Sequence, residues 1–236
     1  MKKVLALTLL VLNTALAVGQ EVNYKTSDGI RVYADHTATR KARGLIILFH
    51  QANGSRLEYE NIAPRLHTLG FSTLAVDQRS GGSEFGGVNK TAAQVTGVDF
   101  LAALPDLEAS LKYAKTTLKA KRIIVWGSSY SSALVFLLAA KNPKEIAGLL
   151  AFSPDEYLGK PSLVRDAAKK VTAPLFITSA ASEVTAAKAI FSATASQEKT
   201  QFIPKGVGLH GSRVLSNPLT GSEYWVAVEK FLNRYK

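Results

Sequence analysis

The sequence RIIVWGSSYSSALVFLLAA, residues 122–140, places two kinds of local structure next to each other without a linker. Residues 122–126 are mostly β-branched and aromatic, which is typical of a short strand buried on both faces of a sheet. Residues 131–140 then continue with the small and apolar side chains of a buried helix. The pentapeptide Gly127-Ser128-Ser129-Tyr130-Ser131 at the junction must therefore turn the chain sharply from strand to helix.

Small residues flank one serine of this turn. Gly127 and Ser131 lie two positions before and after Ser129, which fits the pattern small-x-nucleophile-x-small of a nucleophile elbow. The flanking residues of such an elbow must be small, because the turn is tight and the backbone of the nucleophile is strained. Ser128 is excluded as the nucleophile, since two large aromatic residues would then occupy the small positions. A serine-rich helix cap is the alternative interpretation, so the rest of the chain has to decide between the two.

The rest of the chain repeats the alternation of strand and helix. Residues 22–25 and 30–34 flank Ser27-Asp28-Gly29 and predict an antiparallel hairpin. Further strands are predicted at residues 44–50, 71–77, 146–152, 175–178 and 201–204. Helices are predicted from Ser55, where S-x-x-E with Glu58 forms a capping box, to Gly70, from Pro105, and around Trp225. This pattern predicts one α/β domain with a mostly parallel sheet and helices on both faces.

A serine nucleophile needs a neighbouring base, usually a histidine, which a carboxylate orients. When the serine lies on a strand-to-helix elbow, the chain order is serine, acid, histidine. Only one of the four histidines, His210, follows Ser129, and it lies in a loop between the last predicted strand and the last predicted helix. We therefore expect His210 to be the general base rather than a solvent-exposed bystander.

The acid has two candidates, and each follows a predicted strand. The predicted strand at residues 201–204 leads to His210. Glu183 follows the strand just before it, at residues 175–178, whereas the pair Asp155-Glu156 follows the strand at residues 146–152. We choose Glu183 because it should lie nearer His210, and Asp155 stays as the alternative. An exposed glutamate at the start of a helix is the structural interpretation of Glu183.

Acyl chemistry also needs hydrogen-bond donors for a tetrahedral oxyanion. The backbone N–H of Tyr130, the residue after the nucleophile, is expected to be one donor. The other should come from the loop His50-Gln51-Ala52-Asn53-Gly54, which follows a predicted strand. We assign the backbone N–H of Ala52, with Gln51 as the second choice. His50 itself ends the strand, and we expect a structural role for it.

Taken together, these motifs resemble the α/β-hydrolase superfamily, in particular its small, lidless members similar to dienelactone hydrolases and esterases. Four ordered signals carry the resemblance: residues 50–54, Asp77-Gln78-Arg79-Ser80-Gly81-Gly82-Ser83, the Ser129 elbow, and Glu183 with His210. The similarity covers about residues 22–236. The second signal is similar to the loop D-x-R-G-x-G-x-S of the family, and the resemblance implies architectural roles for its aspartate and arginine, Asp77 and Arg79.

Three positions depart from the usual family pattern. Gln51 replaces a common glycine, which changes the backbone of the oxyanion loop and could add a side-chain donor. Ser131 replaces the second glycine of the elbow, and Glu183 stands where an aspartate is commoner. None of these changes removes a group that the chemistry needs.

The function expected from this arrangement is carboxylic-ester hydrolysis through an acyl-enzyme. Ser129 would attack the acyl carbon, His210 would carry the proton to the leaving group, and Glu183 would stabilise the imidazolium. Residues 153–174 have room for about one helix and no large cap domain, so we expect an open site that takes a small acyl substrate. A peptidase or amidase with the same triad is one alternative, because the fold does not separate esters from amides. A non-catalytic envelope protein that keeps the fold and binds a ligand is the other.

The N-terminus predicts export from the cell. Met1-Lys2-Lys3 precedes an apolar run at residues 4–12, and Ala15-Leu16-Ala17 matches the A-x-A cleavage pattern. The run is shorter than the roughly 20 apolar residues that span a bilayer. We therefore expect a signal peptide at residues 1–17, a hydrolase domain at residues 18–236 without stable membrane insertion, and a periplasmic or secreted protein.

Composition narrows the chemistry further. The chain has no cysteine, which excludes a disulfide framework and a thiol nucleophile. It has no H-E-x-x-H, calcium-loop or Walker pattern, so we expect no metal, no cofactor and no nucleotide. The formal net charge is +11, but Lys and Arg are scattered without a run of four. We expect no nucleic-acid partner and at most a weak attraction to anionic surfaces.

Overall fold

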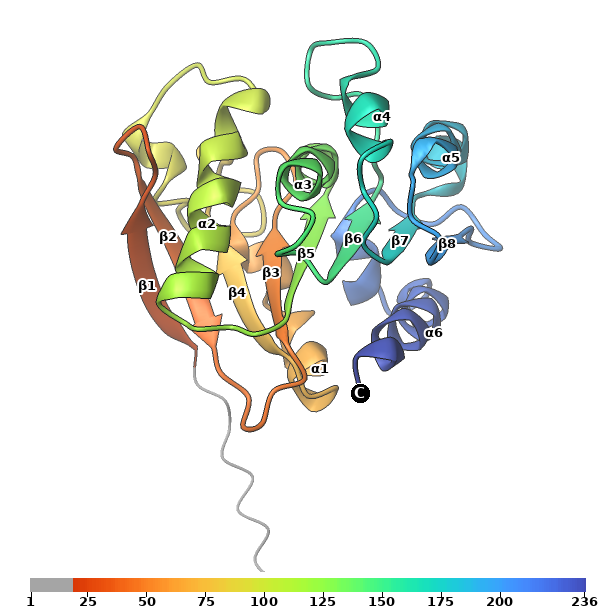
Figure 1. Ribbon diagram of the computed structural model, residues 1–236, viewed down its shortest axis with the longest axis horizontal. Coiled ribbons are helices and arrows are strands. Elements are labelled where there is room, and N and C mark those ends of the chain that lie inside the picture. Colours follow the sequence, from red (N-terminus) through yellow and green to blue (C-terminus); the bar gives the residue numbers. More distant parts are fainter. Residues whose placement is uncertain (1–18) are drawn as a thin grey trace, which may run out of the picture.

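The computed structural model describes residues 19–236, so the predicted signal peptide lies outside the described residues (Figure 1). In this part of the chain, eight strands form one sheet in the order β1-β2-β4-β3-β5-β6-β7-β8. The strands are β1 (Gln20–Lys25), β2 (Arg31–Thr37), β3 (Leu45–Phe49), β4 (Ser72–Val76), β5 (Ile123–Ser128), β6 (Gly148–Phe152), β7 (Leu175–Thr178) and β8 (Lys199–Phe202). The pairs β1–β2 and β2–β4 are antiparallel, and all other neighbours are parallel.

Within residues 19–236, six α-helices cover the two faces of the sheet. They are α1 (Ala63–Thr68), α2 (Leu104–Thr116), α3 (Tyr130–Lys141), α4 (Leu163–Ala168), α5 (Val184–Ala193) and α6 (Gly221–Leu232). Helices α2 to α5 lie on one face, and α1 and α6 lie on the other (Figure 1). The predicted α/β-hydrolase fold, with its N-terminal antiparallel hairpin and without a large cap domain, is confirmed for the described residues.

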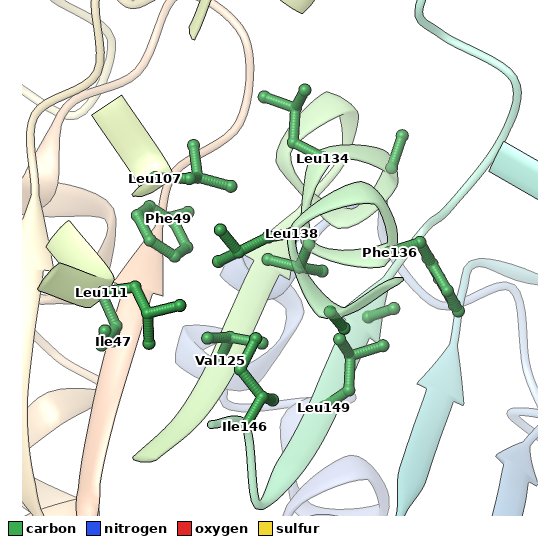
Figure 2. Close-up of a cluster of buried hydrophobic side chains, with 14 of the residues drawn as sticks. Ile47, Phe49, Leu107, Leu111, Val125, Leu134, Phe136, Leu138, Ile146 and Leu149 are labelled. Carbon is green, nitrogen blue, oxygen red and sulfur yellow. The ribbon is translucent and has the colours of Figure 1, made fainter. Parts of the chain in front are cut away.

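The central strands are apolar on both faces, because helices cover both. In β3, Ile47 and Phe49 face the helices α2 and α3, while Ile46 and Leu48 belong to the cluster with α1 and α6. Figure 2 shows the first cluster, in which Leu138 of α3 packs near the sheet. This two-sided burial fixes β3 and β5 side by side at the centre of the sheet, and the loops that follow them meet at one edge.

Two local predictions are wrong in detail. The S-x-x-E motif does not begin an α-helix: Ser55 accepts a hydrogen bond from the N–H of Leu57 and caps the short 3-10 helix Arg56–Tyr59, and α1 begins only at Ala63. The Glu58 carboxylate points into the protein, where it accepts hydrogen bonds from residues outside this turn. Strand β8 lies at Lys199–Phe202 rather than 201–204, since Pro204 has no N–H for a strand ladder.

Among residues 19–236, no helix combines the length and the apolar character needed to cross a bilayer.

Leu138→Ala tests the packing of α3 on the sheet. Leu138 is fully buried, so we expect the variant to lose about 2–5 kcal/mol of unfolding free energy in urea denaturation. Leu219→Ala is the control, because Leu219 is 89% exposed and its loss should change stability by less than about 0.5 kcal/mol. Equal losses in the two variants would contradict this packing.

Candidate active site

Ser129 lies at the turn between β5 and α3, at the carboxyl edge of the sheet. Its backbone has φ 55° and ψ −124°, a conformation that a residue with a side chain rarely adopts. Two hydrogen bonds hold this strained turn: the N–H of Ser129 donates to the carbonyl of Phe152 (2.8 Å), and the N–H of Ser132 donates to the carbonyl of Ser129 (2.8 Å). The predicted elbow is therefore present, and it presents the Ser129 hydroxyl above the strand ends.

Gly127 and Ser131, on the two sides of Ser129, are small for different reasons. A Cβ at Gly127 would lie 2.4 Å from the carbonyl oxygen of Ser131, so the close approach of strand and helix requires glycine. At the other position, the hydroxyl of Ser131 donates to the carbonyl of His50 (2.5 Å) and accepts from the side-chain amide of Gln78 (2.9 Å). Ser131 therefore replaces the usual glycine without steric conflict and ties the elbow to two neighbouring loops.

The three residues predicted as a triad are hydrogen-bonded in one line. The Ser129 Oγ and His210 Nε2 atoms are 2.8 Å apart, and His210 Nδ1 is 2.5 Å from Glu183 Oε1. Because a carboxylate can only accept, the imidazole carries its proton on Nδ1, and Nε2 is free to accept the hydroxyl proton of Ser129. The serine is 6% exposed, so its nucleophilic atom lies in a largely desolvated position.

Further hydrogen bonds fix Glu183. Its Oε2 accepts from the hydroxyl of Ser153 (2.6 Å) and from the N–H of Ala180 (3.0 Å). Burial raises the pKa of Glu183, but the hydrogen bonds from His210 and Ser153 outweigh this effect, and the pKa lies below its usual value. Glu183 is therefore ionised at neutral pH.

The alternative acid lies elsewhere. Asp155 is exposed, and its Oδ1 accepts from the N–H of Glu156 (2.8 Å). Glu156 in turn accepts from the N–H groups of Val164 (2.8 Å) and Arg165 (3.0 Å) at the start of α4. The structure therefore brings Glu183, and neither residue of this pair, to His210.

The predicted oxyanion donors fall into two groups. The backbone N–H groups of Ala52 and Tyr130 donate to no acceptor within residues 19–236 and are available for a ligand. The second choice, Gln51, needs correction: its N–H donates to Glu58 Oε2 (2.7 Å), and its side-chain N–H donates to Glu84 Oε2 (3.3 Å). A buried carboxylate and an exposed carboxylate have thus taken the backbone donor of Gln51 and one of its two side-chain N–H donors.

Comparison with known proteins agrees with this geometry. Residues 40–205 match the model of the hydrolase family described as serine aminopeptidase, S33. The chain belongs to this α/β-hydrolase family. The matched range includes Ser129 and Glu183 and ends before His210. No protein with a curated description matches the sequence.

Solved structures show the same α/β-hydrolase fold. The esterase Pf2001 of Pyrococcus furiosus superposes with a TM-score of 0.73 at 20% identity, covering 92% of this chain and 93% of that one. A dienelactone hydrolase from Anabaena variabilis gives a TM-score of 0.71 at 15% identity, with coverages of 92% and 98%. Est1E from Butyrivibrio proteoclasticus with bound ferulic acid gives 0.68 at 18% identity, with coverages of 88% and 96%.

In this α/β hydrolase, His50 is a structural residue. Its Nε2 accepts from the N–H of Gln78 (3.0 Å) and from the side chain of Asn89 (3.1 Å), so its Nδ1 must donate to the carbonyl of Gln51 (2.8 Å). Burial lowers the pKa of His50 to about 4, and the ring is neutral at physiological pH. It joins residues 50–54 to the long loop of residues 78–97.

Asp77 and Arg79 hold the same long loop. Asp77 accepts from the N–H groups of Arg56 (2.9 Å) and Lys90 (3.1 Å). The guanidinium of Arg79 contacts both Asp106 (2.8 Å) and Asp28 (2.5 Å). Both residues have the architectural role that the family resemblance implied.

Sequence reasoning missed two residues of the site, Ser153 and Ser128. The hydroxyl of Ser153 accepts from the N–H of Gly211 (2.9 Å) and donates to Glu183. The hydroxyl of Ser128 accepts from the N–H of Ser212 and donates to Glu58. The one available signal was their place at the ends of β6 and β5. A terminal serine is too common for that signal to identify either of them.

Gly127→Ala tests the steric requirement of the elbow. The added Cβ would meet backbone atoms that cannot move without shifting α3, so we expect a loss of about 3 kcal/mol or more, or no folded protein. Gly206→Ala is the matched control, because a Cβ there meets no atom within 4 Å and its φ is not positive. Thermal denaturation of both variants checks the expectation, and an unchanged melting temperature for Gly127→Ala would refute it.

Proposed function

We propose that the protein is a serine hydrolase that cleaves carboxylic esters through an acyl-enzyme on Ser129. The observation that carries this proposal is the unbroken hydrogen-bonded line from Ser129 through His210 to Glu183. Two backbone N–H groups that have no acceptor within residues 19–236, those of Ala52 and Tyr130, support it because they can donate to an oxyanion. The esterase names of several proteins with the same fold favour an ester substrate.

The proposed reaction proceeds in two halves. In the first, Ser129 Oγ attacks the ester carbonyl carbon while its proton moves to His210 Nε2, and the negative charge on the carbonyl oxygen is held by the two N–H groups. Collapse breaks the ester bond, and the leaving alkoxide takes the proton from Nε2. In the second half, water gives a proton to Nε2 and attacks the acyl carbon, and Ser129 leaves with that proton. Glu183 keeps the imidazole oriented and stabilises its charged form.

The proposed substrate class rests on the short connection between β6 and β7. Between β6 and β7 the chain forms a loop and the six-residue helix α4, which is too little for a cap domain. Nothing of that size therefore has to open before an ester reaches Ser129. We infer a preference for small acyl groups or for acyl groups that stay partly in solvent.

A peptidase or amidase is the second candidate. It is favoured by the description of the matching family as a serine aminopeptidase. Parallel assays of p-nitrophenyl esters and aminoacyl p-nitroanilides on the purified protein separate the two. A kcat/KM for the best amide that equals or exceeds that for the best ester would replace ester hydrolysis with amide hydrolysis as the function.

A fluorophosphonate probe tests the nucleophile. Such a probe reacts with an activated serine, so we expect it to label the wild-type protein and not Ser129→Ala. Ester hydrolysis should fall at least about 10,000-fold in that variant. Ser222→Ala is the control, since Ser222 is an exposed serine of α6 and should keep full labelling and activity.

Two results would count against this assignment. Equal labelling of the wild type and Ser129→Ala would place the reactive group elsewhere. Failure of folded wild-type protein to react with the probe and with a broad ester panel would favour the non-catalytic binding protein.

We also propose that the enzyme is exported after removal of residues 1–17. The support is the basic N-terminus, the short apolar run and the A-x-A pattern in the sequence. N-terminal sequencing of protein recovered from the periplasm or the medium should give a chain that begins near Val18. Recovery from the cytosol with an intact N-terminus would contradict export.

A further inference from the structure

Glu58 is a buried carboxylate beside the site, and the proposed reaction does not use it. It is 4% exposed, and both of its oxygens accept hydrogen bonds. Oε2 accepts from the backbone N–H of Gln51 (2.7 Å), and Oε1 accepts from the hydroxyl of Ser128 (2.6 Å). The first partner belongs to the oxyanion loop, residues 50–54, and the second immediately precedes Ser129.

Ser128 extends this contact to the segment that carries His210. The N–H of Ser212 donates to the Ser128 hydroxyl (2.8 Å). The preceding amide, of Gly211, donates to Ser153, whose hydroxyl donates to Glu183. Two consecutive amides after His210 therefore each bind a serine hydroxyl that donates to a glutamate carboxylate. In the series Ser212–Ser128–Glu58, the carboxylate of Glu58 has the same place as that of Glu183 in the series Gly211–Ser153–Glu183.

The three segments are also in close steric contact. Gly211 has φ 72°, and a Cβ there would lie 2.7 Å from Ser128 Oγ and 2.8 Å from Gln51 Oε1. The oxyanion loop, the elbow and the histidine segment thus meet at one point without space for a further atom. A displacement of one of them would therefore disturb side chains of the other two.

Glu58 also helps to determine where the Ala52 N–H points. Glu58 accepts from the backbone N–H of Gln51. The backbone carbonyl of Gln51 accepts from Gly54 N–H (3.1 Å) and His50 Nδ1 (2.8 Å). In a trans peptide, the N–H lies opposite the carbonyl. With the Gln51 carbonyl held in this direction, the N–H of Ala52 must point the opposite way, away from its neighbours in the loop.

From these contacts we propose that Glu58 is a positioning residue. It fixes the oxyanion loop through Gln51 and, through Ser128, keeps that loop in register with the elbow and the His210 segment. The inference rests on the proposed function, because it assigns the Ala52 N–H to the oxyanion. Glu58 itself contacts neither Ser129 nor the reacting atoms.

Fold stability alone does not account for a carboxylate at this position. Burial raises the pKa of Glu58 to about 7, although the hydrogen bonds from Ser128 and Gln51 act in the opposite direction. Of the charged groups near it, Glu84 raises the pKa further and His210 lowers it. Because the folded-state pKa lies above the ordinary value of 4.5, the folded protein loses stability as pH rises from about 4.5 to about 7. A glutamine would avoid this loss.

The first experiment separates positioning from stability by steady-state ester hydrolysis. Glu58→Ala frees the oxyanion loop, so we expect kcat to fall about 100-fold while KM stays within threefold. Glu58→Gln should recover kcat to within about fivefold of the wild type, because an amide can accept from Gln51 and donate to Ser128. Recovery of kcat by an uncharged side chain would show that Glu58 acts through its hydrogen bonds rather than through its charge.

Tyr59→Phe is the matched control in the same 3-10 helix. Tyr59 donates a buried hydrogen bond to the carbonyl of Phe49 (2.7 Å) at the end of β3 but does not bind residues 50–54. We expect a lower melting temperature with kcat within about twofold of the wild type. A kcat loss in this control as large as that in Glu58→Ala would show that any destabilisation near β3 lowers activity, and the proposal would fail.

A second experiment does not depend on catalysis. Hydrogen exchange at the Gln51 amide should be at least about tenfold faster in Glu58→Ala than in the wild type, because the amide loses its acceptor. The stability of Glu58→Gln relative to the wild type should also rise between pH 4.5 and 7. An inactive wild type with these two results would refute ester hydrolysis and leave the loop contact standing.

The remaining outcomes decide the proposal. A Glu58→Ala protein that keeps kcat within threefold would overturn it. If Glu58→Ala does not fold, Glu58→Gln decides alone: near-normal kcat with the altered pH dependence of stability supports the proposal, and a folded variant that has lost kcat 100-fold overturns it.

Discussion

The strained backbone of Ser129 is the constraint on which the rest of the site depends. A serine with φ 55° persists only where the surrounding structure leaves it no other conformation. Here a strand buried on both faces leads into the turn, and a helix buried along most of its length leads out of it. The apolar clusters on the two faces of the sheet therefore stabilise the fold and also hold one hydroxyl in a position that the local backbone would not choose.

Around this turn, buried polar groups replace the apolar packing of the core. Ser128, Ser131 and Ser153 are all buried, and each hydroxyl both donates and accepts, so each connects two other segments of the chain. A buried polar group without partners destabilises a fold by about 1–3 kcal/mol, so such connections persist only when nearly all of them are made. The elbow, the oxyanion loop and the histidine segment are consequently positioned as one unit.

Much of this arrangement could be predicted from the sequence, because the signals were either periodic or positional. Strand β7 and the elbow were predicted from buried apolar runs. Glu183 was chosen over Asp155 because it follows the strand next to the one that leads to His210. The role of Glu58 could not be predicted, since S-x-x-E has the same letters whether the glutamate returns to its own turn or points inward. The hydrogen bond of the Gln51 N–H could not be predicted either, because its acceptor, Glu58, is seven residues away in sequence and only the fold brings it close.

The two glutamates beside the histidine segment show how one residue type can serve two purposes. Glu183 is partly exposed and accepts from an imidazole, a hydroxyl and an amide, and its pKa is lowered. Glu58 is fully enclosed and accepts from two neutral donors, and its pKa is raised to about 7. Only Glu183 is therefore reliably charged at neutral pH, as a partner of an imidazolium must be. A group that titrates near pH 7 would be a poor source of constant charge, but it accepts hydrogen bonds in either protonation state. The environment of Glu58 thus suits it to hold a loop in place, and that of Glu183 suits it to stabilise a charge.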